Sequence, residues 1–228
     1  MTSGQIDLAD VTARLLFPTT QQGPWLPFER FADTVATSRK KAGRHSHESS
    51  QVLVYILEGF VNHEDPAGNR ATLTGGGALL LSAAEETEHD LWMEKGRTAR
   101  WISTVIRMPP GAVTGTPAVQ IAQATGTPAS AEGALETAIV GPNGPLRSTL
   151  GLEAARFDFE DEGTCFCRIG GERRAVAYVV AGAVTVDTHR VEAGNGVLAE
   201  NVSGLALHGG PGSRVFLATA PRNGESRG

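Results

Sequence analysis

The chain has 228 residues and a formal net charge of −5, which argues against the basic surface that nucleic-acid-binding proteins present. Its apolar runs are shorter than the roughly 18–20 residues that a membrane-spanning helix needs. The first residues, Met1–Asp7, lack the basic and apolar regions of a signal peptide. We therefore expect a cytoplasmic protein whose partner is a small molecule, with neither nucleic acid nor a membrane as a partner.

The first part of the chain has the pattern of an arm that leads into a strand-rich unit. Residues 1–43 form the arm, with one short strand expected between Ile6 and Leu16. The run from Gln51 to Leu57 is rich in Val, Ile, Leu and Tyr, which is typical of a buried strand. We expect this first unit to extend to residue 108.

Glycine-containing turns divide the first unit. Gly59 ends the first buried strand. The segment Asp65-Pro66-Ala67-Gly68-Asn69 predicts a hairpin turn, because Pro restricts φ while Gly and Asn tolerate positive φ. Gly75-Gly76-Gly77 predicts another sharp turn before an apolar strand from Ala78 to Leu81.

A span rich in Ala, Thr and Gly follows, over residues 109–146. It begins with Pro109-Pro110-Gly111, and its one helix candidate runs from Ala129 to Leu135 with Ser130 as a possible N-cap. We interpret 109–146 as a linker between two domains.

Residues 147–221 again predict short strands separated by Gly turns. The segment from Tyr178 to Val184 resembles the segment from Tyr55 to Val61 at an offset of 123 residues, which predicts a duplicated domain. Cys165 and Cys167 share one strand face, and we interpret them as buried apolar cysteines. Residues 222–228 form a polar tail.

Histidines in the first unit suggest a metal site. His45 and His47 point to the same face if their segment is a strand, and His89 follows where the chain could fold back beside them. Three neutral imidazoles can hold one divalent ion with coordination positions left open. H-x-H alone is a weak signal, and ordinary surface histidines are the alternative. We interpret His63 as a surface or pairing residue.

The order of these features resembles the N-terminal metal-binding cupin of the pirin family. The shared features are an H-x-H, an E-G about a dozen residues later, a G-N hairpin, a glycine turn and a later His. The resemblance is close from Arg44 to about Met108 and weaker elsewhere. It implies an all-β fold of two antiparallel cupin (jelly-roll) barrels in one chain. The first barrel would carry the site, and the second would lack the metal motif.

The resemblance also implies a ligand set. In that family two His of the H-x-H, a later His and a Glu two residues beyond it bind one metal ion. His45, His47 and His89 match the three histidines, whereas Leu91 occupies the Glu position and cannot bind metal. The implied cofactor is a divalent metal, with Fe(II) expected first and Ni, Mn, Cu or Zn as alternatives. Loss of the carboxylate should weaken the binding of hard divalent ions.

An oxygenase without that Glu needs another proton acceptor. Glu58 and the cluster of Glu85, Glu86 and Glu88 supply candidates, and an inward carboxylate in an apolar barrel would have a raised pKa. We take His47, Glu58 and Glu88 as the candidate catalytic residues. Solvated acidic loops are the alternative interpretation.

Three functions remain open. The first is a metal-dependent dioxygenase acting on a small aromatic or phenolic molecule, as the quercetinase-like activity of pirin-like proteins implies. The second is a metal-independent acid/base enzyme, such as an isomerase or a cyclising condensation enzyme of specialised metabolism. The third is a non-catalytic binding or regulatory protein. The three histidines favour the first two, and Leu91 favours the last two.

Overall fold

The structure, a computed structural model, describes residues 4–8, 11–37, 45–94, 96–109, 118–125 and 129–222. It divides into an N-terminal unit, Gly4–Thr125, and a C-terminal unit that begins at Gly126. All regular structure in the described residues is β, and every pair of named strands is antiparallel. The expected all-β class is confirmed. The described chain contains no helix long and apolar enough to cross a membrane.

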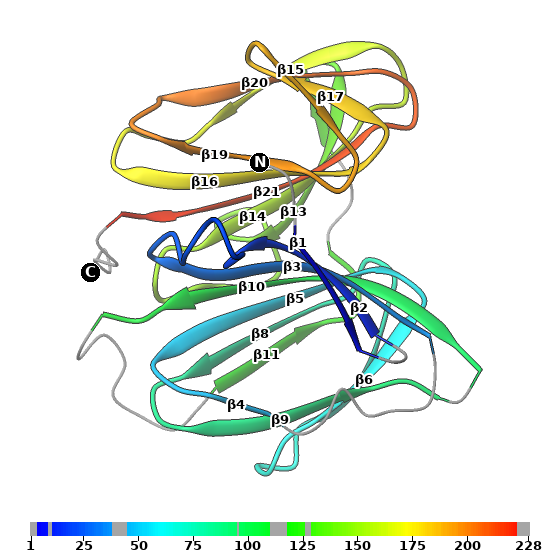
Figure 1. The fold of residues 1–228 in the computed structure, drawn as a ribbon, viewed down its shortest axis with the longest axis vertical. Coiled ribbons are helices and arrows are strands. Elements are labelled where there is room, and N and C mark those ends of the chain that lie inside the picture. Colours follow the sequence, from blue (N-terminus) through cyan, green and yellow to red (C-terminus); the bar gives the residue numbers. More distant parts are fainter. Residues whose placement is uncertain are drawn as a thin grey trace. The chain divides into compact units, whose positions relative to one another are not determined.

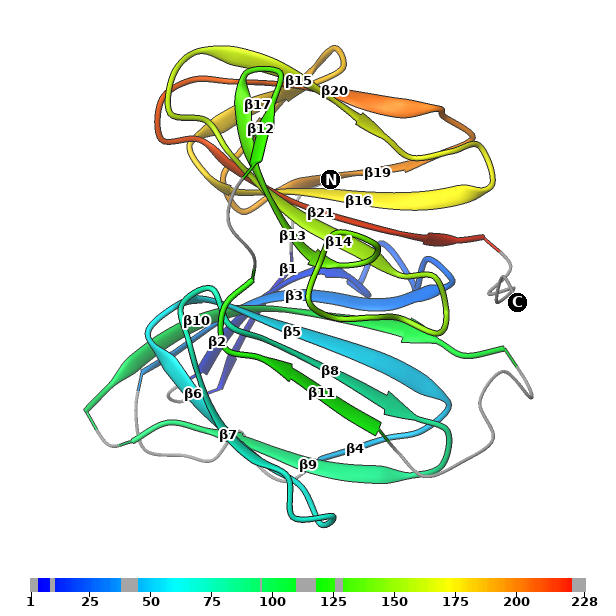
Figure 2. The ribbon, with the colours of Figure 1, turned by 180° about the vertical axis from the view of Figure 1, so that it is seen from behind.

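The N-terminal unit pairs a long sheet with a short one (Figure 1). The long sheet has the strand order β1-β2-β3-β10-β5-β8-β11. Its strands are β1 (Gly4–Leu8), β2 (Val11–Phe17), β3 (Phe28–Thr37), β5 (Ser50–Glu58), β8 (Ala78–Ala83), β10 (Thr98–Arg107) and β11 (Ala118–Ala122). The short sheet, of order β4-β9-β6-β7, has β4 (His45–His47), β6 (Phe60–Glu64), β7 (Arg70–Thr74) and β9 (Thr87–Trp92). Figure 2 shows the same two facing sheets, seen from behind.

An apolar core fills the space between these two sheets. Alternate residues of β5, Val52, Val54 and Ile56, point into it, as the two-residue period of a strand requires. Leu91 from the short sheet and Val105 from β10 belong to the same cluster. This cluster identifies the inner face of each strand, and therefore which side chains can share a site inside the barrel.

The C-terminal unit has the same two-sheet plan. One sheet, of order β12-β13-β14-β21-β16-β19, has β12 (Ala129–Ala131), β13 (Ala134–Val140), β14 (Glu153–Asp158), β16 (Arg173–Ala181), β19 (Gly196–Glu200) and β21 (Arg214–Pro221). The other, of order β15-β20-β17-β18, has β15 (Gly163–Arg168), β17 (Ala183–Val186), β18 (His189–Glu192) and β20 (Gly204–Gly209). Each unit therefore has the paired sheets of one cupin barrel.

The repeat expected from the sequence has a structural counterpart. Gly59 lies between β5 and β6 with φ of 75°, and Gly182 lies between β16 and β17 with φ of 70°. Both glycines adopt the left-handed region that favours glycine. The two positions are 123 residues apart in the chain, so the same turn joins corresponding strands in both units.

The expected arm and linker both contain strands. The arm contributes three strands to the long sheet, β1, β2 and β3, rather than one. The linker expected over 109–146 is too long, because β11 pairs with β8 in the first unit and β13 pairs with β14 in the second. Residues 110–117 and 126–128 of that span lie outside the described residues. The polar tail from residue 223 also lies outside them.

The helix candidate from Ala129 to Leu135 is wrong. The segment is a β-hairpin in which Ala131 pairs with Ala134 across a two-residue turn. Both turn residues have positive φ, 44° at Glu132 and 105° at Gly133. Two-residue hairpin turns of this kind match the twist of the flanking strands. Helix propensity is a weak signal, and sheet pairing overrides it here.

We expect Gly59→Ala to destabilise the N-terminal unit much more than Gly68→Ala. Both glycines have positive φ, so each substitution carries a backbone cost of about 1–2 kcal/mol. A Cβ at Gly59 would also lie 2.1 Å from the carbonyl oxygen of Thr98, whereas a Cβ at Gly68 meets no atom within 4 Å. Urea unfolding of the two variants measures the difference. Equal losses of unfolding free energy would contradict the close approach at Gly59.

Candidate metal centre

Two neighbouring strands of the short sheet carry three histidines. β4 carries His45 and His47 on one face, and β9 carries His89. The antiparallel register of the two strands places His45 directly opposite His89, and residues directly opposite each other project to the same side of a sheet. His89 precedes Leu91 by two residues, and Leu91 belongs to the inner core, so all three imidazoles face the barrel interior.

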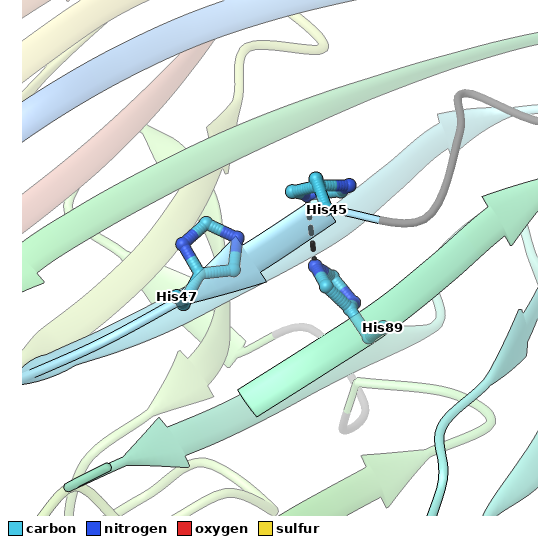
Figure 3. A group of neighbouring side chains, drawn as sticks. All are labelled: His45, His47 and His89. Atoms are coloured by element: carbon cyan, nitrogen blue, oxygen red, sulfur yellow. Dashed lines mark hydrogen bonds between the residues drawn. The ribbon is translucent and has the colours of Figure 1, made fainter. Parts of the chain in front are cut away.

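The three side chains converge (Figure 3). One ligand atom from each lies within 4.8 Å of those of the other two, and ring centroids are 4.4–5.1 Å apart. His45 Nε2 and His89 Nε2 are 3.0 Å apart and share a hydrogen bond. Burial increases from exposed His45 through half-buried His47 to fully buried His89. The cluster is therefore open to solvent on the His45 side.

Burial keeps two of these imidazoles neutral. The pKa of His47 is lowered to about 4 by burial, and further by the nearby His45 and Arg30. The pKa of His89 is lowered to about 3 by burial, and further by the neighbouring histidines. Neutral imidazole is the form that binds metal ions. At neutral pH His47 and His89 are therefore in the protonation state that a metal site requires.

Unpaired nitrogens fit the same chemistry. In the described part of the protein, His47 Nε2 and His89 Nδ1 are buried and have no hydrogen-bond partner. Leaving a buried polar atom unpaired costs about 1–3 kcal/mol. A metal ion coordinated by the imidazoles would use such lone pairs. The donor set of three imidazoles suits Fe, Ni, Cu or Zn better than Mg or Ca.

The structure places the expected carboxylates away from the three histidines. Glu58 is exposed and ends β5, whereas Ser50, three residues after His47, begins it. The eight-residue offset from Ser50 to Glu58 corresponds to roughly 26 Å of extended strand. Glu88 is exposed and pairs with Ser46, so it projects to the outer face. The roles of His47, Glu58 and Glu88 in catalysis stay predictions, and the positions of the two carboxylates do not favour theirs.

The neighbouring strand adds a histidine that the sequence did not assign to the site. His63 on β6 is fully buried, and its ring centroid lies 5.6 Å from that of His89. The interpretation of His63 as a surface residue is wrong, whereas the alternative of a pairing residue has a counterpart in Asp65, whose Oδ2 lies 3.7 Å from His63 Nε2. Its cross-strand partner is Leu91, so it projects to the inner face. Its two-residue spacing from Val61 was the one local signal that could have indicated this facing.

An arginine on the long sheet also faces the cluster. Arg30 on β3 is the register partner of Val105, a member of the inner core, so it projects inward. Its charge contributes to the lowered pKa of His47. Although Arg30 projects inward, it is exposed to solvent. A cation therefore lies close to His47, and nothing in the local sequence distinguishes it from a surface arginine.

The C-terminal unit differs at its interior. Cys165 and Cys167 are free thiols on β15 and are buried in its apolar core. The pKa of the Cys167 thiol is raised by its contact with Cys165 and by burial, so it stays protonated at neutral pH. A cavity of about 260 Å³ in this unit is lined in part by Glu136, Phe166 and Cys167. This interior lacks the cluster of imidazoles found among the described residues of the first unit.

Comparison with known proteins gives consistent relatives. A family model described as Pirin matches residues 19–101. Quercetin 2,3-dioxygenase of Escherichia coli (strain K12) is 25% identical over 206 residues, which cover 83% of this chain and 80% of that protein.

Solved structures with this fold include a bacterial pirin and a quercetin 2,3-dioxygenase. The bacterial pirin YhhW in complex with nickel(II) from Escherichia coli has a TM-score of 0.82 at 19% identity, covering 96% of this chain and 95% of that one. A quercetin 2,3-dioxygenase from Acinetobacter baumannii has a TM-score of 0.84 at 17% identity, covering 96% and 76%. These likenesses confirm the fold of two cupin barrels.

We expect metal-free protein to lose stability as the pH falls below 6.5. The pKa values of His47 and His89 drop from 6.5 in the unfolded chain to about 4 and about 3 in the folded protein. Below pH 6.5 the unfolded chain therefore binds protons that the folded protein does not. Thermal unfolding in chelator at pH 7.5, 6 and 5 measures this loss.

His47→Gln should flatten that pH dependence, and His208→Gln is the control because His208 is exposed in the C-terminal unit. If His47→Gln leaves the slope of stability against pH unchanged, His47 does not titrate as its burial requires.

Proposed function

Because the chain is a pirin-like cupin protein, we propose that it is a metal-dependent dioxygenase acting on a small aromatic or phenolic molecule. The observation that carries this proposal is the convergence of His45, His47 and His89 on the inner face of the first barrel. A quercetin 2,3-dioxygenase among the relatives and a pirin solved with nickel(II) support it. Fe(II) is the ion we expect first, with Ni, Mn, Cu and Zn as the alternatives.

The chain's own groups have separate tasks in this proposal. His45, His47 and His89 hold the ion, and burial keeps His47 and His89 in the neutral form that binds metal. When bound, such an ion would polarise a substrate oxygen as a Lewis acid and, if redox-active, would mediate electron transfer from the bound substrate to oxygen. Arg30, with its positive charge near His47, attracts the oxygen of an ionised phenol. Exposed His45 leaves this side of the cluster accessible to a substrate.

A second function is favoured by one position. Leu91 is 5% exposed and belongs to the inner core, at the place where the resemblance expects a glutamate ligand. An apolar side chain there removes both a metal ligand and a proton acceptor. This favours a metal-independent acid/base enzyme, an isomerase or a cyclising condensation enzyme, that would use the same histidines. The experiments below separate the two functions.

We expect protein purified without added metal to contain one divalent ion per chain and His47→Ala to lose it. The variant removes one of three protein nitrogens, so occupancy should fall on the order of tenfold or more. Elemental analysis measures the ion, with His208→Ala as the matched control on an exposed histidine. A wild type free of metal that also binds none on titration would contradict the proposal.

We expect Leu91→Glu to raise metal occupancy, because it adds a carboxylate two residues beyond His89 on the same strand face. Leu91→Gln is the matched control, since it has the same size without the charge. Elemental analysis of both variants, after circular dichroism confirms that they are folded, gives the comparison. Equal occupancy in the two variants would show that no ion reaches this position.

Turnover should require both metal and oxygen. A panel of flavonols and simpler phenols serves as the substrate set, and oxygen uptake is the readout. We expect strong chelator or anaerobic buffer to abolish activity and added Fe(II) to restore it. Full turnover in chelator without oxygen would instead establish the acid/base function. If no substrate turns over and His47→Ala leaves ligand binding unchanged, a binding role remains.

A further inference from the structure

His63 is a fully buried imidazole, without a hydrogen bond among the described residues, beside the three-histidine cluster. Its side chain is 0% exposed, and neither ring nitrogen has a hydrogen-bond partner among the described residues. The 5.6 Å between the His63 and His89 ring centroids is close to the 4.4–5.1 Å within the cluster itself. Buried polar groups in native proteins are nearly always satisfied. Asp65 approaches only one of the two ring nitrogens, so the other needs a partner that the described residues do not supply.

A carboxylate in the turn directly after β6 orients this ring. Asp65 Oδ2 lies 3.7 Å from His63 Nε2, and Asp65 is nearly buried. Asn69 holds the carboxylate in place, since its backbone N–H donates to Oδ1 at 3.0 Å and its side-chain amide donates to Oδ2 at 2.7 Å. With Asp65 on the Nε2 side, Nδ1 is the nitrogen left for another partner. Metal-binding histidines typically have such a carboxylate behind the non-coordinating nitrogen.

His63 lies directly beside Leu91, the apolar residue at the position where the resemblance expects a glutamate ligand. His63 and Leu91 are direct cross-strand partners, so their side chains project side by side from β6 and β9. His89 is two residues before Leu91 on the same face. The neighbouring strand therefore provides an imidazole in the layer where β9 provides a leucine.

We infer that His63 is the fourth protein ligand of the metal ion held by His45, His47 and His89, with Asp65 as the residue that orients it. This rests on the proposed function, in which the three histidines bind an ion. The His63 nitrogens lie outside the group whose ligand atoms are within 4.8 Å of one another, so the ring turns toward the cluster on binding. The complete set is then four imidazoles with one buried carboxylate behind them.

Four nitrogen donors give the site a metal preference. Imidazole suits Ni, Cu, Zn and Fe, whereas a carboxylate ligand improves the binding of harder ions such as Mn. The chain should therefore bind Co(II) or Ni(II) tightly and discriminate against Mn(II). Leu91→Glu should narrow that difference, because it introduces a hard oxygen donor into the same layer.

The test uses the full chain stripped of metal and titrated with Co(II) alone. Calorimetry gives the affinity, and the visible absorption of bound Co(II) reports its ligands. His63→Leu should weaken binding by at least about tenfold and change the spectrum. Asp65→Asn, which leaves the ring in place, should weaken binding by about 10–100-fold, as loss of a partner behind a ligand does. His208→Ala is the control on an exposed histidine and should change neither quantity.

A double variant keeps the inference testable if His63→Leu folds poorly. If His63 supplies the fourth ligand, Leu91→Glu should raise the Co(II) affinity more in His63→Ala than in the wild-type chain, because the carboxylate then occupies an empty position. Unchanged affinity and spectrum in His63→Leu, with binding lost in His47→Ala, would overturn this inference and leave the proposed function standing. Absence of Co(II) binding to the wild type would overturn both.

Discussion

The antiparallel pairing of β4 with β9 is the constraint on which the candidate site depends. Three residue pairs define it, and one of them places His45 opposite His89. A slip of one residue would turn every side chain of the strand to the other face. His45 and His47 would then face outward while His89 stayed buried. The inward facing of Leu91 in the apolar core opposes that slip, so the core residues of β9 and the site on β9 depend on the same register.

This register brings three imidazoles together inside the barrel, where the described residues do not satisfy all of their nitrogens. Imidazoles that would be partly protonated in water are held close together in a largely apolar interior, and their pKa values fall. Some of their nitrogens have no partner in the described chain. Such groups cost free energy unless something binds them. The cluster is therefore better suited to binding a ligand than to stabilising the fold.

The two units show how one fold can exist with and without such a site. Both use two facing sheets, and the same glycine turn joins β5 to β6 and β16 to β17. In the first unit polar imidazoles interrupt the inner face, whereas in the second the corresponding interior is filled by valines, leucines and two cysteines. The fold supplies rigid strands, and the identity of a few inward side chains decides whether chemistry can occur there.

Sequence alone determined the elements that depend on local physics. The H-x-H spacing placed two imidazoles on one face, the Gly and Asn residues after Asp65 indicated a hairpin, and the repeat at Tyr178 indicated a second barrel. Tertiary structure decided what depends on distant partners. Strand parity shows which residues share a face but not which face is buried or which strand lies opposite. For this reason the burial of His63 was decided by strand pairing, which joins residues far apart in the chain. The same holds for the strands β11 and β13 inside the expected linker.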